Sequence, residues 1–112
     1  MTSCLQLLTP SVANTCYNMG ALYYRQGDYP LALQYLQMCL DIRLDKLGTD
    51  HPDVATTYNN MALVYGKQED YPRALEYYQM CLDIKSGTLG KDHPSVASTY
   101  NNMAWVYSAQ SY

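Results

Sequence analysis

The sequence predicts an all-α protein built from stacked helix pairs, and three observations support this fold class. Blocks of sequence recur at a fixed spacing, and apolar residues within each block follow the helical period. No segment alternates at period two for long enough to indicate a strand. The 112 residues suffice for one domain with a modest core, which we expect to hold five helices.

The recurrence has a period of 42 residues. Val12-Ala13 returns as Val54-Ala55 and as Val96-Ala97. The hexapeptide at 37–42 returns unchanged at 79–84, and the Asp-His-Pro at 50–52 returns at 92–94. Self-similarity of this density indicates a tandem array. We expect repeat 1 over about 10–51, repeat 2 over about 52–93 and a half repeat over about 94–112.

The first helix of each unit is clearest in repeat 2. Tyr58, Met61, Ala62 and Tyr65 stand at i, i+3, i+4 and i+7, which places them on one face of a helix. This pattern predicts a helix near 53–68. Its counterparts at the 42-residue spacing predict helices near 11–26 and 95–110.

The second helix of each unit follows after a short join. Ala74, Leu75, Tyr78 and Leu82 share one face over two turns, which predicts helices near 71–88 and, one repeat earlier, near 29–46. Asp70 suits the N-cap, because its side chain can accept from a backbone amide of the first turn. The longer joins supply a glycine to stop one helix and a proline to begin the next, as at Gly90 and Pro94.

These residues resemble the signature of the tetratricopeptide repeat. Tyr65, Tyr71, Ala74, Tyr78 and Leu82 match its pattern directly, whereas Met61-Ala62 stands for the usual Leu-Gly and Cys81 for a small Ala. The 42-residue period is similar to that of kinesin light chains and nephrocystin-3-like proteins. The resemblance implies an α-solenoid of antiparallel helix pairs, about two and a half repeats long, that acts as a protein–protein interaction module.

Composition excludes several other classes of function. No apolar run reaches the ~20 residues of a membrane helix, and the net charge of −3 argues against a nucleic-acid partner. The N-terminus lacks the basic residues of a signal peptide, so the four cysteines are interpreted as reduced thiols of a cytoplasmic protein.

Neither a metal site nor an active site can be assembled from the sequence. His51 and His93 recur in identical joins with only Asp50 and Asp92 close by, so turn capping explains them better than metal binding. No nucleophile–base pair and no Gly-rich phosphate loop is present. We therefore expect no catalysis and no cofactor.

The resemblance places ligand contacts on the concave surface formed by the first helices. Side-chain amides there could hold the backbone of an extended peptide, because they both donate and accept hydrogen bonds. Arg25 and Lys67 stand at equivalent positions 42 residues apart, and these two cations could attract an acidic peptide. The third equivalent position is Ala109, which carries no charge. The candidate partner-binding residues are Asn18, Asn59, Asn60, Asn101, Asn102, Leu63, Tyr24, Arg25 and Lys67.

The last predicted helix has no second helix after it, so its apolar face should remain uncovered. A fragment of a longer array, self-association and an engineered scaffold of near-identical copies all fit this observation. The alternative function is therefore a structural self-assembly unit that oligomerises through this helix, with Trp105, Met103 and Tyr107 as the contacts. At the other end, Leu5, Leu7 and Leu8 are interpreted as the remnant of a preceding second helix.

Overall fold

The computed structural model describes residues 9–110, which form five helices and no strand. The helices are α2 (Pro10–Gln26), α3 (Tyr29–Leu47), α4 (Pro52–Lys67), α5 (Tyr71–Leu89) and α6 (Pro94–Gln110). Their bounds lie within one residue of the predicted ranges, which confirms the all-α fold. Cys4 and the proposed helix remnant at Leu5, Leu7 and Leu8 lie outside the described residues.

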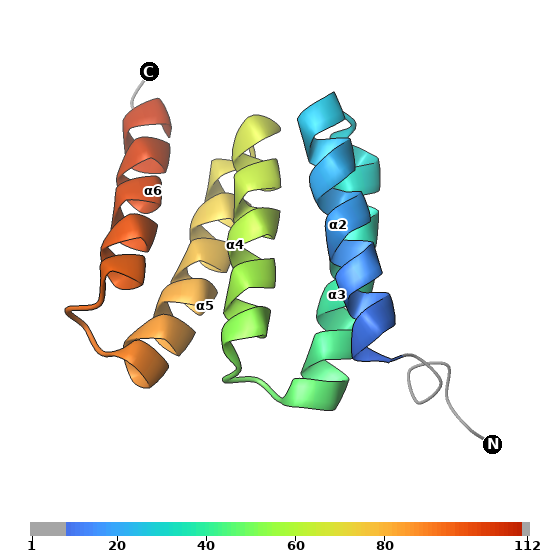
Figure 1. The fold of residues 1–112 in the computed structure, drawn as a ribbon. Helices are drawn as coiled ribbons and strands as arrows, with labels where there is room; N and C mark the ends of the chain where they lie inside the picture. Colours follow the sequence, from blue (N-terminus) through green and yellow to red (C-terminus); the bar gives the residue numbers. More distant parts are fainter. Residues whose placement is uncertain (1–8, 111–112) are drawn as a thin grey trace.

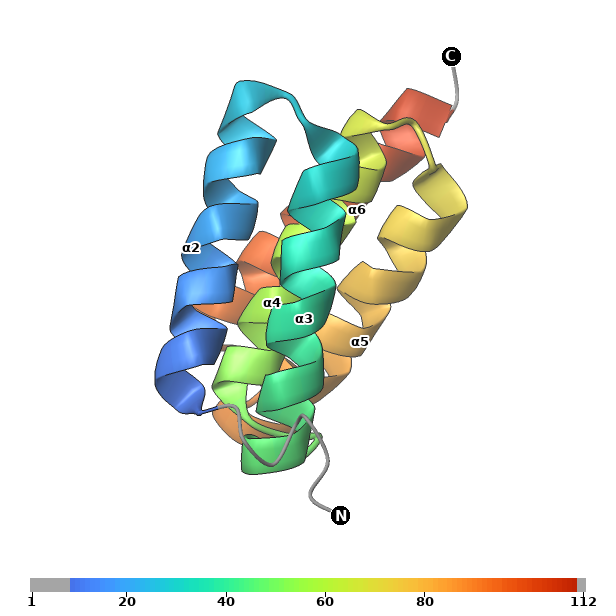
Figure 2. The same ribbon diagram turned by 90° about the vertical axis from the view of Figure 1, so that its right-hand side faces the viewer.

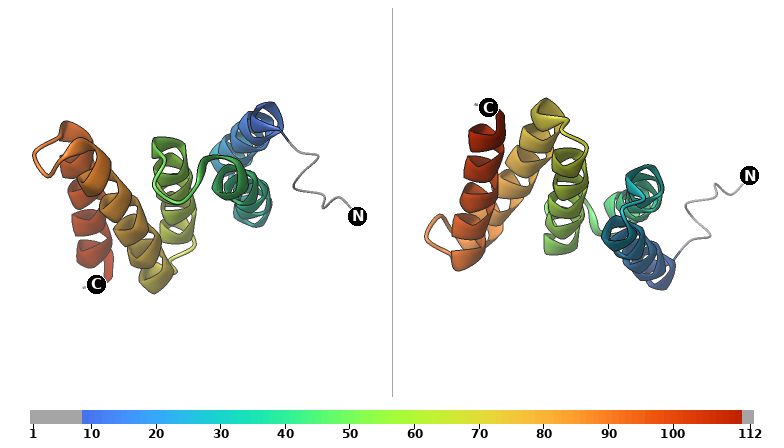
Figure 3. Two further views of the ribbon diagram at one scale, coloured as in Figure 1. Left: turned by 90° about the horizontal axis from the view of Figure 1, so that it is seen from below. Right: turned by 90° about the horizontal axis from the view of Figure 1, so that it is seen from above.

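The helices stack in chain order as antiparallel neighbours. Figure 1 shows α4 between the α2–α3 pair on one side and α5 and α6 on the other. In Figure 2, α2 and α3 lie nearest the viewer and the later helices follow behind them. The two end-on views of Figure 3 show the resulting open, stepped stack, which measures 50 × 33 × 20 Å. Each helix packs mainly on its neighbours in sequence, as expected for a solenoid.

Side chains in the joins fix where the helices begin. Asp28 and Asp70 are N-caps whose carboxylates accept from the amides of Leu31 and Arg73, each at 3.3 Å. His51 Nδ1 accepts from the Asp53 amide at 3.0 Å, and His93 Nδ1 from the Ser95 amide at 3.1 Å. The interpretation of the two histidines as capping groups is thus confirmed.

Small residues allow the paired helices to approach closely. Ala62, Ala74 and Cys81 are completely buried. Gly20 occupies the position of Ala62 one repeat earlier, and a Cβ on Gly20 would lie 2.8 Å from Leu36 Cγ. The α2–α3 pair therefore packs more tightly at this point than an alanine would permit.

A buried arginine links three helices at the junction of the two repeats. The Arg43 guanidinium donates to Asp53 O (3.1 Å), Thr57 Oγ1 (2.9 Å) and Asn14 Oδ1 (3.1 Å). It also lies 4.9 Å from the ring centroid of Tyr17. The equivalent residue one repeat later, Lys85, makes two longer contacts of the same kind, at 3.4 and 3.5 Å.

Candidate functional site

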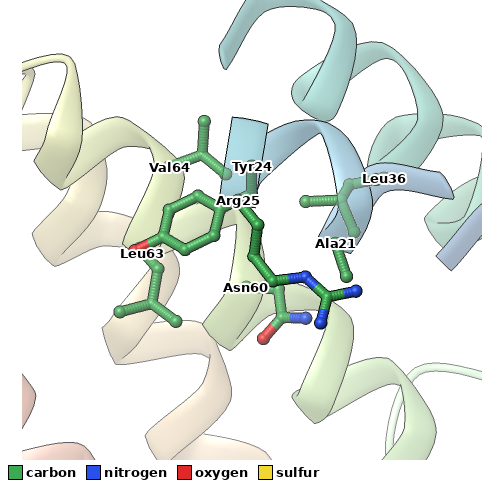
Figure 4. Close-up of a pocket in the computed structure, with 8 residues that line it drawn as sticks. Ala21, Tyr24, Arg25, Leu36, Asn60, Leu63 and Val64 are labelled. Carbon is green, nitrogen blue, oxygen red and sulfur yellow. The ribbon is translucent and has the colours of Figure 1, made fainter. Parts of the chain in front are cut away.

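A pocket of about 320 Å³ lies between α2 and α4, where the sequence predicted ligand contacts. Tyr24 and Arg25 reach from α2 toward Leu63 and Asn60 of α4 (Figure 4). Leu36 of α3 lines the same pocket. The remaining lining residues are Gly20, Ala21 and Val64. The surface is mainly apolar, with one amide and one cation.

A second pocket of about 180 Å³ repeats this arrangement between α4 and α6. Seven of its eight lining residues are the 42-residue counterparts of those in the first pocket: Leu63, Gly66, Lys67, Tyr78, Asn102, Trp105 and Val106. Tyr24 is the eighth, so Tyr24 and Leu63 line both pockets. We call the two pockets together the groove.

Each of the two pockets of the groove carries one positive charge. Arg25 lines the first pocket and Lys67 the second, both exposed, and no carboxylate lines either one. Tyr78 is almost completely buried in the wall of the second pocket, and this burial raises its pKa to about 12. Its phenol therefore remains neutral at physiological pH, so the two cations dominate the electrostatics of the groove.

The predicted asparagines occupy three different environments. Asn60 and Asn102 line the first and second pockets. Asn102 Nδ2 donates to Asn59 Oδ1 at 3.4 Å, so this pair also bridges α4 and α6. Asn18 and Asn101 are exposed and line none of the pockets described here.

The three residues predicted for self-association do not share one surface. Trp105 is 56% exposed and lines the second pocket of the groove. Met103 is partly buried against the cluster that contains Ala74 and Val106. Tyr107 is 56% exposed and, two residues from Trp105, is rotated from it by about 200° around the helix axis. Any role of these residues in self-association remains a prediction.

The thiols in the described part of the chain serve as packing groups. Cys16, Cys39 and Cys81 are unpaired and buried. Burial raises the pKa of Cys39 and of Cys81, although Arg43 and Lys85, respectively, partly oppose this effect. Both thiols are consequently protonated and poor nucleophiles at neutral pH.

Two other kinds of site are absent from residues 9–110. These residues contain no group of three or more histidine, cysteine and acidic side chains placed to hold a metal ion. Within the same range, no helix has both the length and the apolar character needed to cross a membrane.

The sequence reasoning missed the contribution of the second helices to the groove. Leu36 and Tyr78 form part of the two pockets although they belong to α3 and α5. The 42-residue spacing relates them, so the repeat itself could have identified them as a pair. Their position on an apolar helix face, however, indicates only burial.

The stacked helix pairs and the repeated groove define a helical-repeat protein of the solenoid class. The family model described as tetratricopeptide repeat matches residues 11–86 and, one repeat later, 53–111. The chain belongs to the tetratricopeptide repeat family. The repeats of this family are generally protein–protein interaction modules and typically non-catalytic scaffolds.

Two solved structures show the same arrangement of helices. BtubC (BKLC) from P. vanneervenii is 26% identical, with a TM-score of 0.84 over 91% of this chain and 41% of that protein. A putative kinesin light chain of Podosopora anserina, described as having nearly identical TPR-like repeats, is 22% identical, with a TM-score of 0.77. The match covers 92% of this chain and 49% of that one. The chain thus spans less than half the length of either protein, and no curated protein matches it significantly.

Proposed function

We propose that the chain binds an extended peptide segment of a partner protein in the groove between its first helices, without catalysis. The observation that carries this proposal is the repetition of one pocket at a spacing of 42 residues, with Tyr24 and Leu63 common to both copies. An extended chain can place side chains in successive pockets, while Asn60 and Asn102 accept from and donate to its backbone. Arg25 and Lys67 favour a peptide that carries acidic residues.

A peptide-display selection tests the proposal without a known ligand. Peptides enriched on the intact chain would be measured against Leu63→Arg, which places a charge between the two pockets, and against Asn60→Ala. We expect the affinity to fall at least tenfold in Leu63→Arg, with an unchanged far-UV circular dichroism spectrum. Gln79→Ala is the matched control, because this exposed residue on α5 contacts Asp83 rather than the groove. Peptides that bind Leu63→Arg as tightly as the wild type would refute the groove as their site.

The proposal includes a cytoplasmic location. The three buried, unpaired thiols support it, because a reducing compartment keeps cysteines in this state. Absence of catalysis is supported by the two histidines, whose Nδ1 atoms are engaged as helix caps. Purified protein should therefore show no cysteine-dependent activity. Rapid modification of Cys39 or Cys81 by a thiol reagent under native conditions would contradict this description.

The second candidate function is self-assembly through α6, and the exposure of Tyr100 and Tyr107 at 56% each favours it. The two candidates respond to different substitutions. A peptide binder should lose affinity in Asn60→Ala or Asn102→Ala, the two asparagines that line the pockets, while it keeps its fold. A self-assembly unit should change its mass in Trp105→Ala or Tyr107→Ala, as measured by light scattering over a wide concentration range.

A further inference from the structure

The two long joins that lead from a second helix to the next first helix carry the same cap, and each cap depends on an unprotonated imidazole nitrogen. His51 Nδ1 accepts from the Asp53 amide at 3.0 Å, and His93 Nδ1 accepts from the Ser95 amide at 3.1 Å. A backbone N–H is always the donor in such a bond, so Nδ1 carries no proton in either ring. These two residues are the only histidines among the 112 residues.

Protonation of the two rings would remove both caps. An imidazolium ring carries a proton on each nitrogen, so it has no acceptor left for a backbone amide. Its charge would also lie at the N-terminal ends of α4 and α6, where the helix dipole disfavours a cation. Histidine is the side chain that ordinarily changes charge between about pH 5 and 8. The second helices α3 and α5 are capped by aspartates instead, and aspartate ordinarily ionises well below this range.

We propose that the two joins form a pH-sensitive device, in which mild acid removes the caps of α4 and α6 together and loosens the contact between successive helix pairs. The backbone carbonyl of His51 still accepts from the amides of Val54 and Ala55, at 3.0 and 3.2 Å, so the helix itself persists and only its first turn is weakened. The proposal makes no use of the groove and therefore goes beyond the binding of a peptide.

The charged groups around His51 come from two helices and from the join itself. Asp53 Oδ2 of α4 lies 3.9 Å from His51 Nδ1, and Asp50 directly precedes the histidine. Arg43 and Lys46 of α3 line a small pocket together with His51, whereas the lining residues from α2 carry no charge. A protonated His51 would thus gain an ion pair with Asp53, and the two cations of α3 would oppose its charge.

The surroundings of His93 lack this compensation. No carboxylate is paired with its ring within residues 9–110, because Ser95 stands at the position of Asp53. Lys85 of α5 donates to the Ser95 carbonyl at 3.5 Å, and Lys91 and Asp92 precede the histidine in the join. Protonation of His93 therefore removes a cap without forming an ion pair. Ser95→Asp should supply the missing carboxylate and reduce the acid sensitivity of this join.

NMR spectroscopy of the intact chain follows each cap directly. The backbone amide signals of Asp53 and Ser95 and the ring signals of both histidines are recorded from about pH 7.5 to about pH 5.5. We expect each amide proton to move upfield with the same midpoint as the ring that it is bonded to, since it loses its acceptor. The amides of Leu31 and Arg73, which are bonded to aspartate caps, serve as controls and should not move. Amides of Asp53 and Ser95 that stay unchanged while the rings titrate would overturn the proposal.

Urea unfolding at the same two pH values measures the consequence for stability. The folded chain requires unprotonated rings, so the unfolded chain binds protons more readily and the free energy of unfolding falls as the pH falls. For the loss of two caps, we expect the unfolding equilibrium constant of the wild type to rise by roughly fivefold or more at the lower pH.

The matched control is the double variant His51→Asn/His93→Asn. Asparagine also caps helices through a side-chain oxygen, but it does not titrate. The two chains share every carboxylate, so the effect of the acidic groups cancels in the comparison. The unfolding equilibrium constant of the double variant should change less than about twofold between the two pH values, and that of Ser95→Asp should change less than that of the wild type. An equal pH dependence in the wild type and the double variant would overturn the proposal.

Discussion

The repeat provides an internal control for the energetics of the junction between units, through Arg43 and its counterpart Lys85. Both side chains cross from a second helix to the next first helix, and both donate to a buried threonine hydroxyl there, on Thr57 and Thr99 respectively. The perturbation is Arg43→Ala, compared with Lys85→Ala in the same background. Because the backbone setting is equivalent, the difference between the two reports the side-chain contacts.

The contacts predict that Arg43→Ala is the more damaging change. Arg43 is only 7% exposed, donates three hydrogen bonds of 2.9–3.1 Å and lies over a tyrosine ring. A hydrogen bond from a charged donor contributes about 1.5–3 kcal/mol. The lower value applies here, because Thr57 also donates to Asp53 O and Asn14 is exposed to water. With lost packing and cation–π contact, we expect a cost of about 3–5 kcal/mol for Arg43→Ala.

Lys85 is half-buried and its two contacts are at the long limit of a hydrogen bond, so Lys85→Ala should cost only about 1 kcal/mol. Arg43→Lys should fall between the two alanine variants, because it keeps the charge but loses the planar fork.

The assay is equilibrium unfolding in urea, followed by circular dichroism for the whole chain and by Trp105 fluorescence for the α6 end. If the two transitions coincide, the free energy of unfolding can be calculated with a two-state model. If they are separated, the data require a model with a stability for each repeat and an interaction between neighbouring repeats. A cost for Lys85→Ala equal to or larger than that for Arg43→Ala would refute the reasoning from burial and distance.

Three other changes test separate parts of the structure. Gly20→Ala should lower the free energy of unfolding by about 1 kcal/mol, because the new Cβ would lie 2.8 Å from Leu36 Cγ. This overpacking should outweigh the higher helix propensity of alanine. A higher stability of the variant in a urea titration would show instead that Leu36 can move aside. The pKa of Tyr78 is near 10 in the unfolded chain and is raised to about 12 by burial, so the free energy of unfolding should fall as the pH rises between those values. This loss, on the order of 2 kcal/mol, should be smaller in Tyr78→Phe. Identical dependence of the melting temperature on pH in the wild type and in Tyr78→Phe would contradict the burial argument. Asp70→Ala removes the N-cap of α5 and should cost about 1 kcal/mol in the same urea assay, while an unchanged midpoint would mean that water caps the helix equally well.

The helices could be predicted closely because each boundary carries a local chemical signal. At the starts of α3, α4, α5 and α6, a proline fixes the backbone φ angle in the first turn, and an aspartate or histidine side chain accepts a hydrogen bond from a free backbone amide of that turn. Gly27 adopts the left-handed conformation that ends α2. These signals are repeated at 42-residue spacing, so an uncertain boundary in one unit is supported by its counterpart. The resemblance to the repeat signature also identified Ala74 and Cys81 as positions of small residues, and both are completely buried.

The groove was harder to predict, because a pocket depends on three helices at once. Periodicity identified the inward positions of the first helices, and Tyr24, Arg25, Asn60 and Leu63 do line the first pocket. It could not show that Leu36 would form part of that pocket, since any apolar residue of a second helix is expected in the core. The bridging role of Arg43 was also missed, because an arginine near the end of a helix is expected to lie on a solvent-exposed face.

The two pockets keep one framework and vary in bulk, which would let an array of near-identical units bind the extended peptide proposed above. Asn60 and Val64 of the first pocket are Asn102 and Val106 in the second, so the amide and the apolar floor are constant. Around them, Ala21 becomes Leu63 and Leu63 becomes Trp105, while the tyrosine at 24 becomes glycine at 66.

The exchange of a large for a small side chain at one position, Tyr24 to Gly66, is offset by the opposite change at another, Leu63 to Trp105. The groove is therefore preserved while its shape changes. The Trp105 ring comes within 3.8 Å of where a Cβ of Gly66 would stand, so it covers the space that the lost tyrosine ring would fill. The second pocket is accordingly the smaller, at about 180 Å³ against about 320 Å³. For the proposed peptide, selectivity for the order of its side chains would therefore require no departure from the repeat backbone. The constant backbone would fix the spacing of the pockets, and a few substitutions of unequal volume would decide which peptide residue each pocket accepts.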